Sequence, residues 1–321
     1  MAGAPRRERL VIGHGHQHGH VHGGPSARAG LRHRHRLVWA LVLVGGFLGV
    51  ELAAAVVSNS LALGSDVGHM FGDVTGLALA LAAVQLAERH AARGDAGRHT
   101  FGLYRLEIIG AFVNSLLLVG VAVWLVVEAV SRLGEPPQVM GGWMVVAAAG
   151  GLVVNVAAFL VLRPGAAESL NVKAASVEVL ADLVGSVAAL AAGVAVWSTG
   201  AHWVDAAVGG LVGLWILPRA VGLGRQATRI LLQSAPGHLD VAELQRSLEG
   251  LEGVREVHDL HVWTLTSEME SLSAHLVLDE GAELHDVLDR ARDLLRGEWG
   301  IAHATLQVEP ADHEGCDQVG W

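Results

Sequence analysis

The chain has 321 residues, of which 52% are hydrophobic and 17% are charged. A soluble protein carries about 25% charged residues, so this composition argues against a wholly soluble chain. From residue 233 to the end, 19 Asp and Glu residues stand against 5 Arg, a net charge of −14, which argues against nucleic-acid binding.

The first 36 residues are polar and contain a histidine tract. They lack the apolar core of a signal peptide, so we expect residues 1–36 to be a retained, disordered cytoplasmic tail. The stretch HGHQHGHVH places histidines at every second position, namely His14, His16, His18, His20 and His22. Such tracts bind metal ions without a fold. The alternatives are an inert low-complexity tail and a remnant of cloning.

Six apolar stretches follow, and a membrane-spanning helix needs about 20 such residues. They cover residues 37–57, 61–87, 108–127, 140–162, 171–197 and about 203–217. Arg and Lys gather before the first stretch and in the loops after the second, fourth and sixth. By the positive-inside rule, we expect an all-α, six-helix transmembrane domain over residues 37–232 with both termini cytoplasmic.

Two of these apolar stretches carry paired ionisable side chains. HMFGD holds His69 and Asp73, and EVLAD holds Glu178 and Asp182. Residues four apart lie on one helix face, and each charge at mid-membrane costs about 2.5–3.5 kcal/mol. If the two faces meet, one imidazole and three carboxylates can hold a divalent ion in the tetrahedral N/O geometry that Zn²⁺ favours. The alternative is a polar cluster that only locks helices together.

The residues after 233 have the pattern of a small α+β domain. Asp240 can cap a helix that runs to about residue 249. Strand-like runs follow at VREVHDLHVWTL, SLSAHLVL and HATLQVE, with a helix over about 283–296 between the last two. The order α-β-β-α-β predicts a ferredoxin-like two-layer cytoplasmic domain over residues 233–310, and residues 311–321 are expected to form a flexible tail.

Several motifs resemble one family in the same order along the chain. SLALGSDVGHMFGDVTGLALALAA and EVLADLVGS resemble the second and fifth spans of the cation diffusion facilitator family. The TFG at residues 100–102, with Arg105 and Glu107, resembles the cytoplasmic loop of that family. HDLHVW, SAHLVL and HATLQVEP resemble its cytoplasmic domain, so the chain is identified as a member from about residue 37 to 310.

The resemblance implies a homodimeric, proton-coupled exporter of divalent metals from the cytoplasm, of the bacterial zinc, cobalt and cadmium efflux type in the cell membrane. Its transport site corresponds to His69, Asp73, Glu178 and Asp182. Metal binding needs a neutral imidazole and ionised carboxylates, so His69, Asp73 and Asp182 are the expected proton carriers. Zinc-transporting members typically have His at the position of Glu178. A carboxylate there hardens the site, so besides Zn²⁺ the main substrate can be Cd²⁺, Co²⁺, Mn²⁺ or Fe²⁺.

The resemblance also implies metal ligands in the cytoplasmic domain, at His258, His275 and Glu309. His261 is either a further ligand or a residue of the strand surface. His238 can join a site at a dimer interface, and His313 with Cys316 can add a ligand pair near the end of the chain. For each of these residues the alternative is an ordinary surface side chain.

Other classes of function fit the sequence less well. An intramembrane zinc hydrolase needs an HExxH motif, which HMFGD lacks, and a metal-pumping ATPase needs a phosphorylation domain or a P-loop. We therefore expect no enzyme activity. A membrane metal sensor without transport and an Na⁺/H⁺ exchanger remain as alternatives, although in the exchanger the histidines would be idle.

Overall fold

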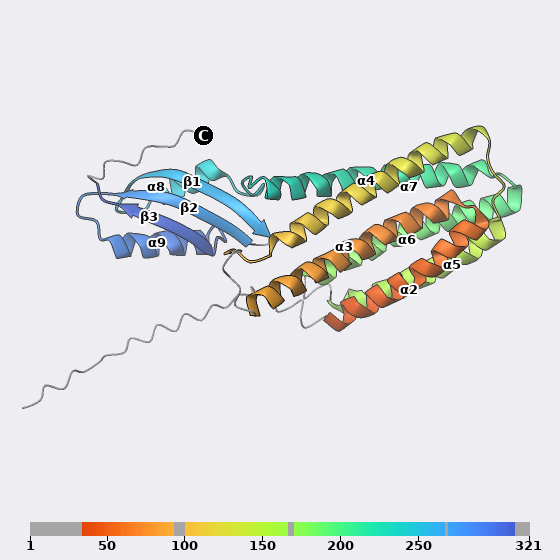
Figure 1. Ribbon diagram of the computed structural model, residues 1–321, viewed down its shortest axis with the longest axis horizontal. Helices are drawn as coiled ribbons and strands as arrows, with labels where there is room; N and C mark the ends of the chain where they lie inside the picture. The colour runs from red at the N-terminus through yellow and green to blue at the C-terminus, as the bar shows by residue number, and fades with distance from the viewer. Residues whose placement is uncertain (1–33, 93–99, 166–169, 267–268, 312–321) are drawn as a thin grey trace, which may run out of the picture.

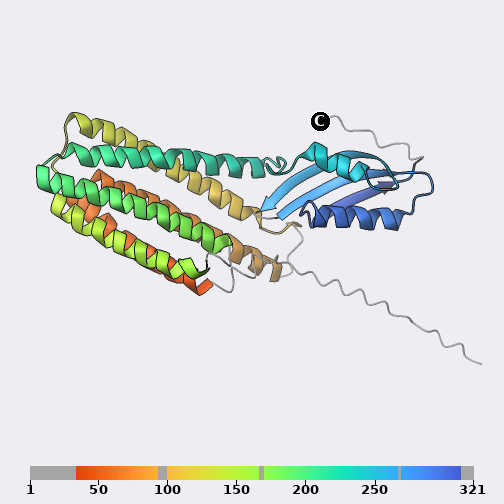
Figure 2. The same cartoon turned by 180° about the vertical axis from the view of Figure 1, so that it is seen from behind.

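The computed structural model describes residues 34–92, 100–165, 170–266 and 269–311. An elongated bundle of helices carries a small sheet domain at one end (Figure 1), and the view from behind shows the same two parts (Figure 2). In the described residues, the bundle consists of the long helices α2 (Arg34–Ser58), α3 (Leu61–Ala92), α4 (Arg105–Gly134), α5 (Gly141–Leu162), α6 (Leu170–Thr199) and α7 (Trp203–Leu231), with the short 3-10 turn η1 (Arg163–Gly165) after α5.

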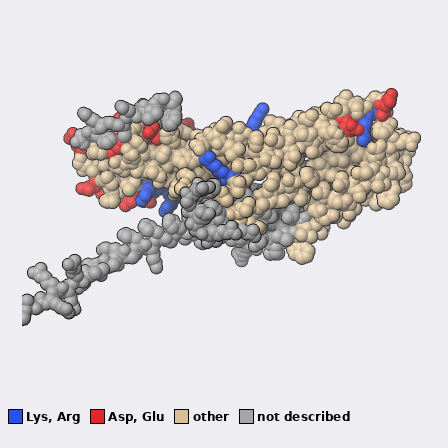
Figure 3. All heavy atoms as spheres, viewed as in Figure 1, with Lys and Arg blue, Asp and Glu red and all other residues tan. Residues whose placement is uncertain are grey.

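Within the described residues, four stretches have the length and composition of a membrane span. They are Arg105–Gly134, Gly141–Leu162, Ser176–Thr199 and Trp203–Leu231. Helix α2 adds the shorter apolar stretch Val42–Ser58. The visible face of the bundle carries few charged side chains, whereas Asp and Glu cluster on the sheet domain (Figure 3). An apolar outer face of this kind suits contact with lipid.

Helix α7 is longer than the sequence pattern suggests. The last apolar stretch was expected to end near residue 217, but the helix continues through Pro218 to Leu231. A proline removes one backbone hydrogen bond inside a helix. Here α7 packs along α4 over a long contact, and this packing holds the helix together beyond Pro218.

The start of α3 is fixed by a side chain from another helix. Asp205, in the first turn of α7, is buried. Its carboxylate accepts hydrogen bonds from the backbone N–H of Leu61 at 2.7 Å and of Ala62 at 3.1 Å, and from the hydroxyl of Ser60 at 2.5 Å. The first N–H groups of a helix have no partner inside it, so Asp205 satisfies them and ties α3 to α7.

The sheet domain contains two helices and three strands. Strand β1 (Val254–Thr266) pairs antiparallel with β2 (Met269–Leu278), and β2 pairs parallel with β3 (His303–Glu309). Helix α8 (Val241–Glu249) precedes β1, and α9 (Leu284–Gly297) lies between β2 and β3 in the chain. The expected small α+β domain is thus confirmed. The Asp240 side chain caps α8, accepting hydrogen bonds from the N–H groups of Ala242 and Glu243.

The two faces of this sheet differ in what covers them. Leu272, Ala274 and Leu276 of β2 share one apolar core with residues of α8 and α9. Because successive strand residues point to opposite faces, His275 points to the face away from these helices. That face is where polar side chains of the three strands can meet.

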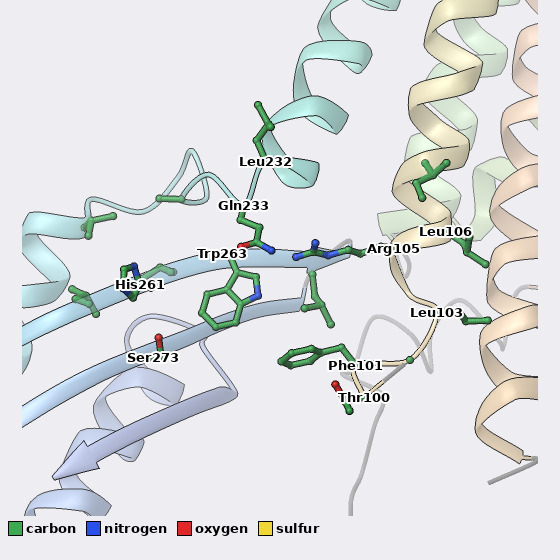
Figure 4. Close-up of a pocket in the computed structure, with 17 residues that line it drawn as sticks. Thr100, Phe101, Leu103, Arg105, Leu106, Leu232, Gln233, His261, Trp263 and Ser273 are labelled. Atoms are coloured by element: carbon green, nitrogen blue, oxygen red, sulfur yellow. The ribbon is translucent and has the colours of Figure 1, made fainter. Parts of the chain in front are cut away.

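The sheet domain meets the bundle at the start of α4. The hydroxyl of Thr266, at the end of β1, donates a hydrogen bond to the carboxylate of Glu107 in α4. Between the two parts lies a half-open cavity of about 1220 Å³, and Trp263 and Phe101 are among the side chains that line it (Figure 4).

Candidate metal centres

The first candidate metal centre lies inside the bundle, between α3 and α6. The imidazole of His69 sits between two carboxylates. Its Nδ1 lies 3.5 Å from Oδ2 of Asp73, and its Nε2 lies 3.5 Å from Oδ1 of Asp182. One donor atom from each residue lies within 4.8 Å of the other two. Helical spacing puts His69 and Asp73 on one face of α3, and packing of α3 against α6 supplies Asp182.

The chemistry of these three donors fits a divalent cation. Two ligands of a tetrahedral zinc ion, each about 2.0–2.1 Å from the metal, lie about 3.3 Å apart. The two observed separations of 3.5 Å involve different nitrogens of His69, whereas one ion binds a single nitrogen, so the side chains must rearrange before the three donors, now within 4.8 Å of one another, share one ion. His69 Nδ1, Asp73 Oδ2 and Asp182 Oδ1 are buried and have no hydrogen-bond partner within the described residues. Buried donors of this kind are energetically costly unless an ion or a proton satisfies them.

Glu178, the fourth expected ligand, lies outside this group. Its carboxylate forms an ion pair with the guanidinium of Arg219 in α7. The Glu178 side chain is 37% exposed, against 5% for Asp182. Glu178 thus pairs with Arg219 and lies apart from the three candidate ligands.

Arg219 is a site residue that the sequence analysis missed. In the sequence it is only one of the positive charges that follow the last apolar stretch. The signal lay in the length of α7, because extending the helix past Pro218 brings Arg219 to the depth of Glu178.

The second candidate metal centre lies on the helix-free face of the sheet. Oε2 of Glu309 is 3.2 Å from Nε2 of His258, and its Oε1 is 2.8 Å from Nδ1 of His275. The two imidazole rings meet edge to face, with their centroids 5.0 Å apart. His258 and His275 are directly paired across β1 and β2, and Glu309 comes from the neighbouring strand β3.

Two nitrogens and a carboxylate on adjacent strands form a ligand set that suits zinc. The Glu309 side chain is only 4% exposed. Its Oε1 also accepts a hydrogen bond from the side-chain amide of Gln307 at 2.8 Å, which helps to fix the orientation of the carboxylate. The three residues that the family resemblance suggested therefore converge, with one donor atom from each within 4.8 Å of the others.

The remaining candidate ligands lie elsewhere. His238 is largely exposed, with its Nε2 3.8 Å from Oε1 of Glu270. His261 lies 3.7 Å from Asp259 and lines the cavity between the two parts (Figure 4). Neither residue joins the group of His258, His275 and Glu309. The histidine tract, His313 and Cys316 lie outside the described residues.

Comparison with known proteins agrees with this architecture of a long helical bundle and a small α+β domain. Residues 37–232 match the family described as the cation efflux transmembrane domain. Residues 236–311 match the cytoplasmic domain of cation efflux proteins. The chain therefore belongs to the cation efflux family, also called the cation diffusion facilitators, and is a membrane protein.

Individual relatives cover nearly the whole chain. The chain is 42% identical over 279 residues to the cation efflux system protein CzcD of Alcaligenes sp., covering 87% of both chains. It is 38% identical over 284 residues to the zinc transporter ZitB of Escherichia coli, covering 88% of this chain and 89% of that protein. It is 32% identical over 282 residues to the cadmium, cobalt and zinc/H(+)-K(+) antiporter of Bacillus subtilis, covering 86% and 89%.

Proposed function

We propose that this protein exports divalent metal cations, chiefly Zn²⁺, from the cytoplasm in exchange for protons. The metal would bind to His69, Asp73 and Asp182 and cross the membrane by alternating access. The observation that carries this proposal is the meeting of three buried donor atoms from α3 and α6 inside the bundle. The names of the relatives, which include a zinc transporter and a cadmium, cobalt and zinc antiporter, support the same class of substrate.

Proton exchange follows from the chemistry of these ligands. A metal ion requires the neutral imidazole of His69 and the ionised carboxylates of Asp73 and Asp182, so protons compete with it. The metal binds on the cytoplasmic side as protons leave, and protons displace it on the outer side. Glu178 becomes the fourth ligand when it separates from Arg219. A site with three carboxylates and one imidazole also accommodates Cd²⁺, Co²⁺, Mn²⁺ or Fe²⁺.

The wider organisation is part of the same proposal. We infer six spans within residues 37–232, with α2 and α3 joining the four apolar helices. The cytoplasmic domain covers residues 233–310, both termini lie in the cytoplasm, and the protein sits in the plasma membrane as a homodimer. The distribution of Arg and Lys along the chain supports this orientation.

The transport proposal is tested in proteoliposomes that contain the full chain. Zn²⁺ uptake driven by a pH gradient and the accompanying proton flux are measured for wild type, His69→Ala and Asp182→Asn. Both variants are expected to lose both fluxes, because each removes one of the ligands. His285→Ala, which changes an exposed histidine of α9, is the control and should behave as wild type. Wild-type fluxes in both site variants would refute the assignment of His69 and Asp182 as ligands. If the wild-type protein binds Zn²⁺ but does not transport it, the protein is a metal sensor and not a transporter.

A second metal site in the sheet domain has its own support in the contacts of Glu309 with His258 and His275. Zn²⁺ bound there stabilises the folded domain, by about 2.7 kcal/mol at a free concentration 100 times the Kd. Hydrogen exchange of β1 to β3 in the full chain measures this gain. His258→Ala should abolish it. His261→Ala, on the same strand but outside the cluster, should keep it, and equal protection in both variants would contradict the site.

A further inference from the structure

Four polar side chains meet in the bundle at a place that the metal ligands do not occupy. Glu51 of α2, Asp66 of α3, Asn155 of α5 and Ser186 of α6 are at most 4% exposed. Asp66 precedes His69 by three residues and Ser186 follows Asp182 by four, so this cluster lies about one helical turn from the metal ligands on both helices. The turn is the one nearer the end of the bundle that is remote from the sheet domain (Figures 1 and 2).

The contacts around Gly151 bring these side chains to one point. The amide nitrogen of Asn155 donates a hydrogen bond to Oγ of Ser186 at 3.1 Å. A Cβ atom on Gly151 would lie 3.5 Å from that same Oγ and 3.6 Å from Oε1 of Glu51. The hydroxyl, the amide and the carboxyl group therefore surround a common space, which the missing side chain of Gly151 helps to leave open.

The carboxyl group of Asp66 reaches the same part of the bundle as that of Glu51, because a Cβ atom on Gly185, the residue before Ser186, would lie 3.2 Å from its Oδ1. Two ionised carboxylates have no hydrogen to share, and both oxygens of Glu51 and Oδ2 of Asp66 are buried without a hydrogen-bond partner in the described part of the chain. Oδ1 of Asn155, itself 1% exposed, is also unpartnered. Unpaired buried carboxylates are strongly unfavourable, so this arrangement needs a positively charged ligand.

The surroundings favour a proton over a metal ion. The other ionisable groups that act on the pair are Asp182, whose charge acts on Glu51, and His69, whose charge acts on Asp66. Two carboxyl groups, one amide and one hydroxyl supply no nitrogen ligand of the kind that Zn²⁺ binds. Hard cations such as Mg²⁺ keep several waters when bound, whereas the four side chains of this cluster are at most 4% exposed. One proton between the two carboxyl groups completes a charge-assisted hydrogen bond.

We propose that Glu51 and Asp66 form a proton-binding site that is distinct from the metal ligands and carries a counter-transported proton. This deepens the proposed antiport and rests on it. A proton that leaves the pair adds negative charge next to His69 and Asp182 and so favours metal binding. A proton that enters from the outer side removes that charge and favours metal release. Asp66 shares α3 with His69 and Asp73, and Ser186 of the cluster shares α6 with Asp182, so proton binding and metal binding act on the same two helices.

The test separates metal binding from proton coupling in full-length protein. Zn²⁺ affinity is measured by calorimetry in detergent, and the proton flux per Zn²⁺ is measured in proteoliposomes with a pH gradient, for Glu51→Gln and Asp66→Asn. We expect both variants still to bind Zn²⁺, but more weakly than wild type because the negative charge of the ionised pair is missing, and to lose the part of the proton flux per Zn²⁺ that the pair carries. Glu128→Gln, which neutralises a Glu paired with Arg132 near the end of α4, is the matched control and should keep both.

Three results would overturn the proposal. The first is a wild-type proton flux per Zn²⁺ in Glu51→Gln. The second is loss of Zn²⁺ binding in folded Glu51→Gln, which would make Glu51 a metal ligand. The third is wild-type coupling that requires K⁺ at a fixed pH gradient, since the pair would then hold a monovalent cation. If Glu51→Gln does not fold, Asp66→Asn decides by the same criteria. A wild type that moves no Zn²⁺ would instead refute the antiport itself.

Discussion

Glu178 and Asp182 lie one turn apart on α6, yet their carboxylates meet different partners. Asp182 faces His69 across the bundle, whereas Glu178 pairs with Arg219 of α7. The guanidinium thus balances the charge of one of the acidic side chains near the proposed transport site. Whether Glu178 takes part in metal binding depends on how easily this ion pair opens.

Removal of Arg219 is expected to strengthen metal binding. A partly exposed ion pair is worth up to about 1 kcal/mol, so in Arg219→Gln the Zn²⁺ dissociation constant should fall by up to about fivefold. Calorimetry on the purified protein measures this change. The double variant Arg219→Gln with Glu178→Gln should show no gain, because the released carboxylate is then missing. Weaker Zn²⁺ binding in Arg219→Gln would mean that Arg219 orients Glu178 as a ligand.

A histidine at position 178 is expected to narrow the choice of metal. An imidazole cannot pair with Arg219 as a carboxylate does, and it adds a second nitrogen ligand, which suits Zn²⁺ better than Mn²⁺. We predict that Glu178→His raises the ratio of Zn²⁺ to Mn²⁺ transport in proteoliposomes supplied with a panel of divalent metals. The wild-type protein assayed at the same pH gradient is the reference. An unchanged ratio would remove Glu178 as a determinant of selectivity.

At the scale of single elements, α3 holds most of the chemistry and is fastened at its start. It carries Asp66, His69 and Asp73, and its first N–H groups are bound by Asp205. A close contact between Gly72 and the side chain of Leu118 brings α3 against α4. The position of the metal ligands relative to α6 therefore depends on groups that touch no metal.

Asp205→Asn is expected to lower stability without removing a metal ligand. An amide keeps one acceptor but places an NH₂ group against donors that the carboxylate now binds, so the loss should be about 2 kcal/mol. Thermal unfolding in detergent should show a lower Tm than wild type. Glu135→Gln, at the exposed end of α4, is the control and should leave the Tm unchanged. An equal Tm for Asp205→Asn would show that this cap contributes nothing to stability.

The sequence predicts these elements well where the signal is local. Helical periodicity places His69 and Asp73 on one face, and strand alternation places His275 away from the apolar core of the sheet domain. The partners across the bundle are harder to predict. Arg219 opposite Glu178 and Asn155 beside Ser186 depend on how two helices pack, which no pattern within one helix encodes. For the same reason, the metal site of His258, His275 and Glu309 is predicted by the family resemblance and not by the spacing of these residues in the sequence.

At the scale of the whole molecule, two candidate metal centres occupy two different structural parts. The bundle holds one among apolar helices, and the acidic sheet domain holds the other on the helix-free face of its sheet. Thr266 and Glu107 join the parts by a hydrogen bond at the start of α4. An acidic domain at one end of the bundle (Figures 1 and 3) attracts cations by its field, which suits the proposed direction of transport.

That direction requires the sheet domain to be cytoplasmic and the loop between α4 and α5 to be external. Arg132 is the single Arg or Lys near this loop, whereas Arg residues gather before α2 and after α3, a distribution that fits an external position of the loop. In a Cys316→Ser background, which removes the only cysteine, we predict that Glu135→Cys reacts with a membrane-impermeant maleimide in intact cells. Asp279→Cys, in the sheet domain, should react only after lysis. The reverse labelling pattern would mean that the protein has the opposite orientation in the membrane, and the proposed transport would then be import.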